Sequence, residues 1–509
     1  MADKSSSGKI EFSIGFGKPV PRARRDDDTP FCIGVLGDFT GRASRGVRDV
    51  GQVKPLMIDT DNFEKVMQKL GIVLSLPHPQ HSDQTMELEF SSIEDFHPDQ
   101  LIQQAEPLAK LVLLRKKLLS PATVVAAAAE VQAVLSQQAV TPGVEVGPTS
   151  STESTEDTMA RLLGNAPLPQ AAGIPSAQKP TINIESLIKN IVAPSVVQKP
   201  TSQQEAALAA LDLELVTQLR SILHYPQFQE LEAGWRAVDF LVRNLDPEES
   251  LKLYVVDISK AELAADLQAQ TELQSAETYR VLYGQPWALL VGNYTFDETI
   301  ADIDILRRMG AIASWLGAPF VAAASPHLIG CESFATQPDP DDWKQPLTGE
   351  SSLAWQTLRQ AAEASSVGLT LPRFLLRQPY GKSSDAIEAF PFEELAAAGN
   401  VHERYLWGNA AFLCGYVLAE AFKEDGWGMI ASGSGEIGEM PLHQFKEDGE
   451  IQVKPCAEAW LTIRAADVIL GHGLMPVMSI KGRDAVRLAG LQSIALPMKP
   501  LALRTGNNS

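Results

Sequence analysis

Residues 366–416 begin SVGLTLPRFLLRQPYGKSS (366–384) and end ERYLWGNAAFLCGY (403–416), with a polar insert between the two parts. This stretch is dense in apolar and aromatic residues, which is typical of segments that pack into a core or against another chain. It contains no recognisable grouping of a nucleophile with an acid and a base. We therefore expect this part of the sequence to specify packing and assembly.

Around this stretch, residues 181–500 alternate between strand-like and helix-like patterns. The region opens with leucines that recur every three or four residues over 208–222, a stripe that must face a partner. Alternation of strands and helices favours an α/β domain with a largely buried sheet. The strand-like runs are 251–258, 287–291, 320–323 and 428–431, and the helical patterns cover 228–245, 261–273, 299–316, 353–364 and 409–422.

Residues 1–136 form a smaller region of the same α/β class. Met86, Leu88 and Phe90 alternate with glutamates, which is the pattern of a strand with one wet face. Helical periodicity covers 98–119, and Asp61 or Asn62 can cap another helix. Other strand-like runs lie at 10–16, 31–36, 56–58 and 72–76, and other helical patterns at 63–70 and 122–135.

The segment between these regions has a different composition. Residues 141–180 are rich in Pro, Gly, Ser, Thr and Glu and contain no aromatic residue. Such a segment buries too little apolar surface to offset its ordering entropy. We therefore predict two α/β domains, 1–136 and 181–500, joined by a flexible linker at 137–180 and followed by a tail at 501–509.

Charge and cysteine content narrow the possible functions. The net charge of −20 argues against nucleic acid and against an anionic membrane face as partners. The four cysteines lie far apart, which favours reduced, buried thiols and a cytoplasmic protein. No secretory signal is visible at the N-terminus, and the longest apolar run, 407–422, is too short to span a bilayer.

Two glycine-containing motifs raise the possibility of phosphate binding. Gly433, Gly435 and Gly438 satisfy G-x-G-x-x-G, but Pro441 opposes the helix that a dinucleotide site needs at this point. Residues 381–384 read GKSS, like the end of a phosphate-binding loop. Residue 376, where the leading glycine of that loop would stand, is Leu376. We expect no cofactor at either place.

Metal ligands and catalytic groups are equally weakly indicated. His402 and Glu403 begin like a zinc-protease motif, but residue 406 is a leucine. Glu436, Glu439 and His443 could be ligands, yet Pro441 breaks any regular helix that would present them together. Nothing singles out a catalytic pair among the eight histidines. The sequence therefore predicts no catalytic, cofactor-binding or metal site.

Read in order, the N-terminal region resembles the small, TssB-like subunit of the contractile sheath of bacterial type VI secretion systems. Each motif is weak alone, and their order and spacing make the resemblance specific. The motifs are KIEF (9–12), PFCIGVLGDFTGR (30–42), MIDTDNFEKVM (57–67), MELEFSSIEDFHPD (86–99) and LAKLVLLRKKL (108–118).

The second region resembles the large, TssC-like sheath subunit, so that both subunits are joined in one chain. The motifs with the strongest match are VGLTLPRFLLRQPYG (367–381) and YLWGNAAF (405–412). Together the two regions cover about four-fifths of the chain. The other motifs are LRSILHYPQFQELEAGWRAVDFLV (219–242), LKLYVVDISKAEL (251–263), LLVGNYTF (289–296), APFVAAASP (318–326), KGRD (481–484) and GLQS (490–493).

The resemblance implies a non-enzymatic, cytoplasmic bacterial protein that polymerises into a helical tube. The implied partners are copies of itself, an inner-tube protein, baseplate components and a sheath-remodelling ATPase, whose contact we place at 184–192. Neither nucleic acid nor membrane insertion is implied. We also expect the two regions to dock on each other, through the helix containing Leu108 and the 208–222 stripe.

One departure from the family pattern leaves an alternative open. Large sheath subunits continue well past the GLQS motif, whereas this sequence stops at Ser509. A linking strand could then come from 9–17 or 181–200. Alternatively, the chain is a sheath-like accessory protein or baseplate adaptor that does not form the tube. A nucleotide-dependent enzyme is the remote third hypothesis.

Overall fold

The computed structural model confirms the α/β class and divides the chain into two compact units. One unit comprises Met1–Leu113 and Asp212–Ser509, and the other comprises Leu114–Leu211. The domain boundaries predicted from the sequence stay predictions. The residues that the structure describes are 28–46, 49–78, 81–120, 123–124, 126–131, 202–343, 347–395, 401–429, 435–447 and 449–503.

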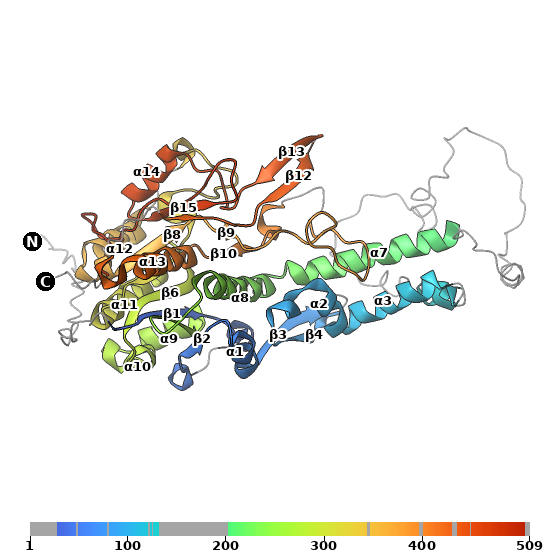
Figure 1. The fold of residues 1–509 in the computed structure, drawn as a ribbon, viewed down its shortest axis with the longest axis horizontal. Coiled ribbons are helices and arrows are strands. Elements are labelled where there is room, and N and C mark those ends of the chain that lie inside the picture. Colours follow the sequence, from blue (N-terminus) through green and yellow to red (C-terminus); the bar gives the residue numbers. More distant parts are fainter. Residues whose placement is uncertain are drawn as a thin grey trace, which may run out of the picture. The chain divides into compact units, whose positions relative to one another are not determined.

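Nine strands of the described residues form one sheet in the first unit, in the order β11-β15-β14-β8-β7-β6-β1-β5-β2. Strands β15, β8, β6, β1 and β2 of this sheet are labelled in Figure 1. The six strands from β14 to β5 run parallel to one another. The strands are β1 (Phe31–Gly37), β2 (Leu56–Ile58), β5 (Leu251–Asp257), β6 (Trp287–Phe296), β7 (Phe320–Ala324), β8 (Val367–Leu371), β11 (Glu436–Ile437), β14 (Met475–Ser479) and β15 (Val486–Leu488).

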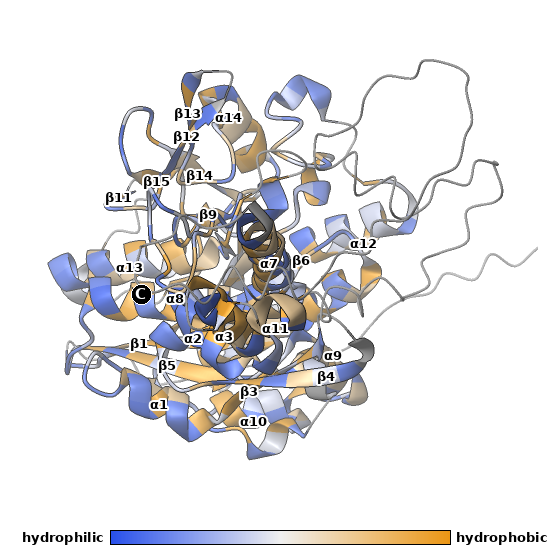
Figure 2. Cartoon of the chain, turned by 90° about the vertical axis from the view of Figure 1, so that its right-hand side faces the viewer, coloured by the Kyte–Doolittle hydropathy of each residue, from blue (hydrophilic) through white to orange (hydrophobic). Residues whose placement is uncertain are grey.

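Strand β1 lies inside this sheet, between β5 and β6, although it belongs to the small-subunit-like region. Val35 of β1 is in register with Val255 of β5 on one side and with Val291 of β6 on the other. All seven residues of β1 are buried, and β1 is predominantly hydrophobic (Figure 2). Sequence on both sides of the expected linker therefore builds one core, and the two regions meet at β1. Docking through the helix containing Leu108 and the 208–222 stripe stays a prediction.

Helices cover both faces of the sheet. On one face, Phe31 of β1 packs against Phe422 of α13 (Ala411–Asp425), with ring centroids 4.9 Å apart. On the other face, Leu36 and Leu290 share a core cluster with Leu306 of α11 (Ile300–Leu316). This two-sided burial explains why the central strands read as nearly continuous apolar runs.

Helix ends in this unit follow from local capping. The Thr299 side chain accepts a hydrogen bond from the Asp302 backbone at the start of α11, and Gly317 ends the helix with φ of 64°. Ser259 and Glu262 form a capping box at the start of α9 (Lys260–Ala269). The other helices are α1 (Phe63–Leu70), α2 (Pro98–Gln104), α3 (Glu106–Leu119), α7 (Ser202–Leu223), α8 (Pro226–Leu245), α10 (Glu277–Leu282), α12 (Gly349–Gln360) and α14 (Ile463–Gly471).

Three two-stranded ladders complete the described strands. The hairpin of β3 (Ile72–His78) and β4 (His81–Phe90) belongs to the small-subunit-like region. The other two belong to the large-subunit-like region. They are β9 (Phe374–Leu375) with β10 (Trp407–Gly408), and β12 (His443–Glu447) with β13 (Glu450–Lys454).

The second unit, Leu114–Leu211, is helical where it is described. Residues 126–131 are helical, and Lys117 forms a 3.0 Å ion pair with Glu130. The Gln204 side chain donates a 2.7 Å hydrogen bond to the Leu118 carbonyl. The chain segments on the two sides of the predicted linker, 137–180, therefore lie next to each other within this unit.

Several sequence predictions need correction. A strand was predicted at 428–431, but Gly428 ends a 3-10 helix that begins at Gly426. The helix predicted over 98–119 breaks at Ala105, which has an extended backbone. The strand at 10–16, the linker, the 184–192 segment and the end of the tail fall outside the described residues. Among the described residues, no helix is both long and apolar enough to cross a bilayer.

Candidate functional site

The carboxyl edge of β1 and β5 is where sheets of this topology bind ligands, because the chain reverses its direction of travel across the sheet beside β1. Here that position is filled by protein groups. The Asp257 carboxylate accepts hydrogen bonds from the Phe39 backbone at 2.8 Å and from the Thr40 hydroxyl at 2.9 Å. Burial raises the pKa of Asp257, and these hydrogen bonds oppose the shift.

Arg42 closes this group of charges. Its Nε donates to Glu262 at 2.6 Å, and its guanidinium lies 3.4 Å from Asp257. The Glu262 carboxylate also accepts a hydrogen bond from the Ser259 hydroxyl at 2.9 Å. A cavity of about 20 Å³ remains beside Gly41, which is room for about one water molecule. The arrangement joins the loop after β1 to α9 and leaves no room there for a nucleotide.

Segment 366–384 contributes a second arginine, Arg377, to another buried ion cluster. Arg377 donates to Glu232 of α8 at 2.8 Å and to Glu394 at 2.7 Å, and both carboxylates are essentially inaccessible to solvent. Burial alone would raise the pKa of Glu394, but the Arg377 charge lowers it to about 2. The cluster therefore ties segment 376–395 to helix α8.

The same segment also contacts the small-subunit-like region. The Tyr380 ring meets the His97 ring edge-on, with centroids 5.1 Å apart. Asp99 at the start of α2 accepts hydrogen bonds from the backbone amides of Glu388 and Ala389. The QPYG motif and the polar insert thus hold the two family-like regions together at a second place besides strand β1.

Arg373 forms a third cluster, at the surface. It makes a 3.0 Å ion pair with Glu403 and a 2.5 Å ion pair with Glu458. His402 lies 3.0 Å from Glu458, and its other ring nitrogen lies 2.7 Å from the Lys454 amine. Burial alone would raise the pKa of Glu458, but the hydrogen bond from His402 and the Arg373 charge lower it to about 2.

A larger cavity, of about 290 Å³, lies at the carboxyl ends of β6, β7 and β8. Its volume is at the low end for a small-molecule site. The charged groups in its wall include Arg373, Glu403 and Glu458, which are paired with one another. His327 also lines this cavity.

Where the structure describes them, the two glycine motifs differ from the geometry of a phosphate-binding loop. Gly433 falls outside the described residues, and the residues between Gly435 and Gly438 form strand β11 where a dinucleotide fold would begin a helix. In the 381–384 segment, the Gly381 amide donates to the Asp385 carbonyl and the Ser384 hydroxyl contacts the Pro379 carbonyl. The Lys382 amide donates to the Glu393 carboxylate at 3.1 Å, so these donors are already used by groups of the chain itself.

The metal ligands considered from the sequence are placed apart. Two groups of His, Asp and Glu side chains among the described residues could hold an ion, and neither contains Glu436, Glu439 or His443. His443 is instead 2.9 Å from the Tyr405 hydroxyl. The His402–Glu403 pair belongs to one of the two groups, but its third member is Glu458. That no residue is catalytic stays a prediction.

The hairpin β12–β13 presents one face to the chain and another to solvent. Its inner face includes Lys454, whose amine lies 5.4 Å from the centre of the Trp407 ring. On the outer face, Ile451 pairs with Lys446 and Val453 pairs with Gln444. Ile451 and Val453 are 67% and 40% exposed. The hairpin is therefore an open surface on the large-subunit-like region.

Comparison with known proteins identifies the family to which this chain belongs. Residues 205–495, more than half of the chain, match the family described as "EvpB/VC_A0108, tail sheath N-terminal domain". The chain belongs to this tail sheath family. Residues 13–141 match the family described as "Type VI secretion system, VipA, VC_A0107 or Hcp2". Both sheath regions predicted from the sequence are thus present in one chain.

Two curated relatives from Pseudomonas aeruginosa agree with this division. The type VI secretion system sheath protein TssC1 is 34% identical over 307 residues, which cover 58% of this chain and 61% of the relative. The sheath protein TssB1 is 28% identical over 100 residues, which cover 19% of this chain and 58% of the relative. The tail sheath protein described here thus spans about three-fifths of the length of each relative.

Proposed function

We propose that this tail sheath protein is a structural subunit of a type VI-like contractile sheath, with the small and large subunits fused. The observation that carries the proposal is the position of β1 between β5 and β6. A strand from the VipA-like region completes the sheet of the VipB-like region, so the two regions are one structural unit. The relatives named TssB1 and TssC1 support the same pairing.

The proposed activity is self-assembly around an inner tube, followed by contraction that drives this tube outward. A subunit interface that is not self-complementary and does not close into a ring generates a helical tube. Contraction then requires rigid-body shifts between two packings of the same subunits. Fusion fixes a one-to-one ratio of the two regions and raises their effective concentration.

The proposed partners are copies of this chain, an inner-tube protein, baseplate components and a remodelling ATPase, all in the bacterial cytoplasm. A non-enzymatic role fits the way in which the carboxyl edge of the sheet is used. Arg42 forms ion pairs with Asp257 and Glu262, and Arg373 forms an ion pair with Glu458. Such closed ion pairs hold segments together and leave few groups to act on a substrate.

Electron microscopy of the purified full-length protein tests the proposal. Negatively stained samples are prepared with the protein alone and with its inner-tube protein, over a range of salt and protein concentrations. We expect helical tubes whose subunit contains both regions in one polypeptide. Monomers under every condition, or tubes that exclude this chain, would contradict the proposed role.

A further inference from the structure

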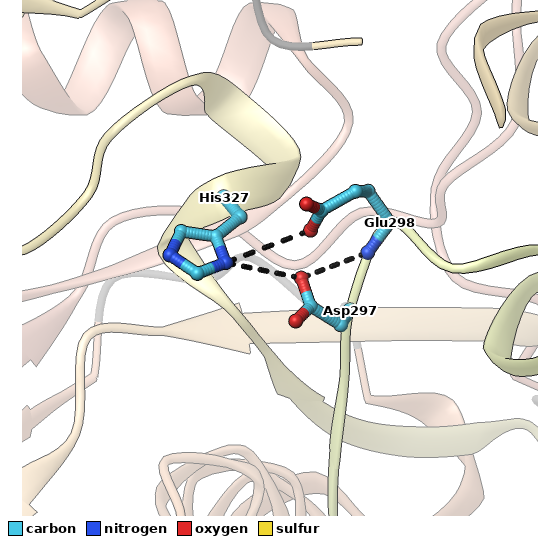
Figure 3. A group of neighbouring side chains, drawn as sticks. All are labelled: Asp297, Glu298 and His327. Atoms are coloured by element: carbon cyan, nitrogen blue, oxygen red, sulfur yellow. Dashed lines mark hydrogen bonds and ion pairs between the residues drawn. The ribbon is translucent and has the colours of Figure 1, made fainter.

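The carboxyl ends of β6 and β7 bring three potential metal ligands together outside the ion clusters described above. Asp297 and Glu298 follow β6 directly, and His327 lies in the 3-10 helix Pro326–Ile329 that follows β7. Figure 3 shows the three side chains pointing toward one another. Each offers one ligand atom, and these atoms all lie within 4.8 Å of one another.

The separations fit a shared ion better than they fit direct contacts. His327 Nδ1 lies 3.4 Å from Asp297 Oδ1 and 3.6 Å from Glu298 Oε2. These distances are long for hydrogen bonds, which have a typical donor–acceptor distance of about 2.9 Å. With metal–ligand distances of about 2.0–2.2 Å, a tetrahedral Zn²⁺ site separates its ligand atoms by roughly 3.4 Å.

Hydrogen bonds from the backbone hold the ligands in place. The Asp297 amide donates to the Asp302 carboxylate at 2.7 Å, and the Glu298 amide donates to the Asp297 carboxylate at 2.9 Å. The His327 amide donates to the Ser325 hydroxyl at 3.3 Å. Support of this kind orients ligands before an ion arrives.

The electrostatics of the group call for a cation. The Asp297 and Glu298 carboxylates lie beside each other, with their ligand atoms within 4.8 Å. Glu298 Oε2 is closed off from solvent and accepts no hydrogen bond from the described residues. The nearby Lys260 amine is already committed, at 2.7 Å each, to Asp302 and to the Thr295 carbonyl.

The second group of potential ligands provides a comparison within the same molecule. His402, Glu403 and Glu458 also lie close together, but Arg373 binds both carboxylates and the Lys454 amine contacts Nδ1 of His402. Protein cations therefore neutralise that group, whereas the described residues offer His327 as the ion-pair partner of Asp297 and Glu298. The two groups should differ in their response to metal.

We propose that Asp297, Glu298 and His327 form a binding site for Zn²⁺. An imidazole nitrogen with two carboxylates suits Zn²⁺ better than the oxygen-preferring Mg²⁺ or Ca²⁺. All three side chains are partly exposed to solvent. The ion would tie the loop before α11 to the segment after β7. This assignment departs from the absence of metal ligands predicted from the sequence, and it does not rest on the proposed sheath function.

The test is a Zn²⁺ titration of the full-length protein in competition with a chromophoric chelator, combined with thermal unfolding. We expect one bound equivalent and a higher melting temperature in the presence of Zn²⁺. Losing a ligand should weaken binding by more than the about 100-fold typical of lost ligand support. His327→Gln and Glu298→Gln should therefore each abolish the bound equivalent at micromolar Zn²⁺.

Two control variants keep the result specific. His472→Gln removes a histidine elsewhere, and Glu403→Gln alters the group neutralised by Arg373; both should bind Zn²⁺ like the parent protein. If His327→Gln does not fold, Glu298→Gln alone decides. The proposal fails if no saturable equivalent binds, or if Glu298→Gln retains it.

Discussion

Strand β1 and hairpin β12–β13 are both short β-segments of this sheath-family chain, and they lie in opposite environments. Every residue of β1 is buried, and strands pair with it on both sides. In the hairpin, β12 and β13 pair with each other, and Ile451 and Val453 on the outer face are exposed. Apolar β-residues therefore serve two purposes here: internal recognition at β1, and an open surface at the hairpin.

The fused chain places contacts between its two sheath regions at β1. In β1, apolar side chains and backbone hydrogen bonds join the VipA-like region to the VipB-like region. Exposed strand edges invite pairing with other chains unless they are short or charged. The hairpin is short, and Lys446 and Glu450 lie on it. Substitutions should therefore affect folding at β1 and leave folding nearly unchanged at the hairpin.

The largest expected effect comes from one substitution made at both places. Ile33→Asp puts a carboxylate into the centre of the sheet, where Ile33 is fully buried. It should lower the free energy of unfolding by at least about 5 kcal/mol, because it buries an unpaired charge. Ile451→Asp should change it by less than about 0.5 kcal/mol, as is usual at exposed positions. Urea unfolding measures both, and equal losses would remove the contrast.

A second pair of variants tests the buried ion cluster against a surface ion pair. Arg377→Met leaves Glu232 and Glu394 buried without their cation, which should cost about 3–5 kcal/mol. Arg243→Met on the same helix α8 breaks an exposed pair with Asp239 and should cost less than about 1 kcal/mol. Thermal or urea unfolding distinguishes them. Near-equal costs would show that the cluster does not hold segment 376–395 to α8.

Lowering the pH should decrease the free energy of unfolding through the protonation of two carboxylates. The pKa values of Glu394 and Glu458 are lowered to about 2 from the ordinary 4.5. A lowered folded-state pKa contributes stability that is fully present above pH 4.5 and is lost as the pH falls toward 2. The urea midpoint should therefore fall between pH 5 and pH 3. A midpoint that stays constant or rises over this range would contradict the assignment of these ion pairs.

The smallest effect concerns the thiols. All four cysteines are buried. Burial raises the pKa to about 12 for Cys331 and Cys414 and to about 11 for Cys456. The native protein should react with less than one equivalent of a thiol reagent at pH 8, and the unfolded protein should react with four. Rapid reaction of a native thiol would indicate that its part of the core opens readily.

The sequence predicted the elements better than their partners. Residues 31–36 and 251–258 were recognised as strands from their apolar β-favouring runs, and both form strands. Their parallel pairing could not be predicted, because β1 and β5 are about 220 residues apart in the chain and periodicity carries no long-range register. At 428–431, where the sequence predicts a strand, Gly428 ends a 3-10 helix whose Trp427 packs against Phe31, and residues 430–431 lie outside the described residues.

The charged groups were harder to predict than the strands. Arg373 and Arg377 both lie within residues 366–384. Their partners Glu232, Glu394 and Glu458 are scattered along the chain. A scattered set of ligands gives no local spacing to recognise. For the same reason the sequence did not predict the group of Asp297, Glu298 and His327. These residues meet because two neighbouring parallel strands end at one edge of the sheet.

The central claim is that β1 makes both sheath regions one structure, and cleavage of their connection tests it most directly. A specific protease site placed within 141–180 allows the purified protein to be cut once under native conditions. The two fragments should then elute together on a sizing column and separate only in denaturant, because strand pairing at β1 does not depend on the connecting peptide. Fragments that elute separately without denaturant would contradict the account.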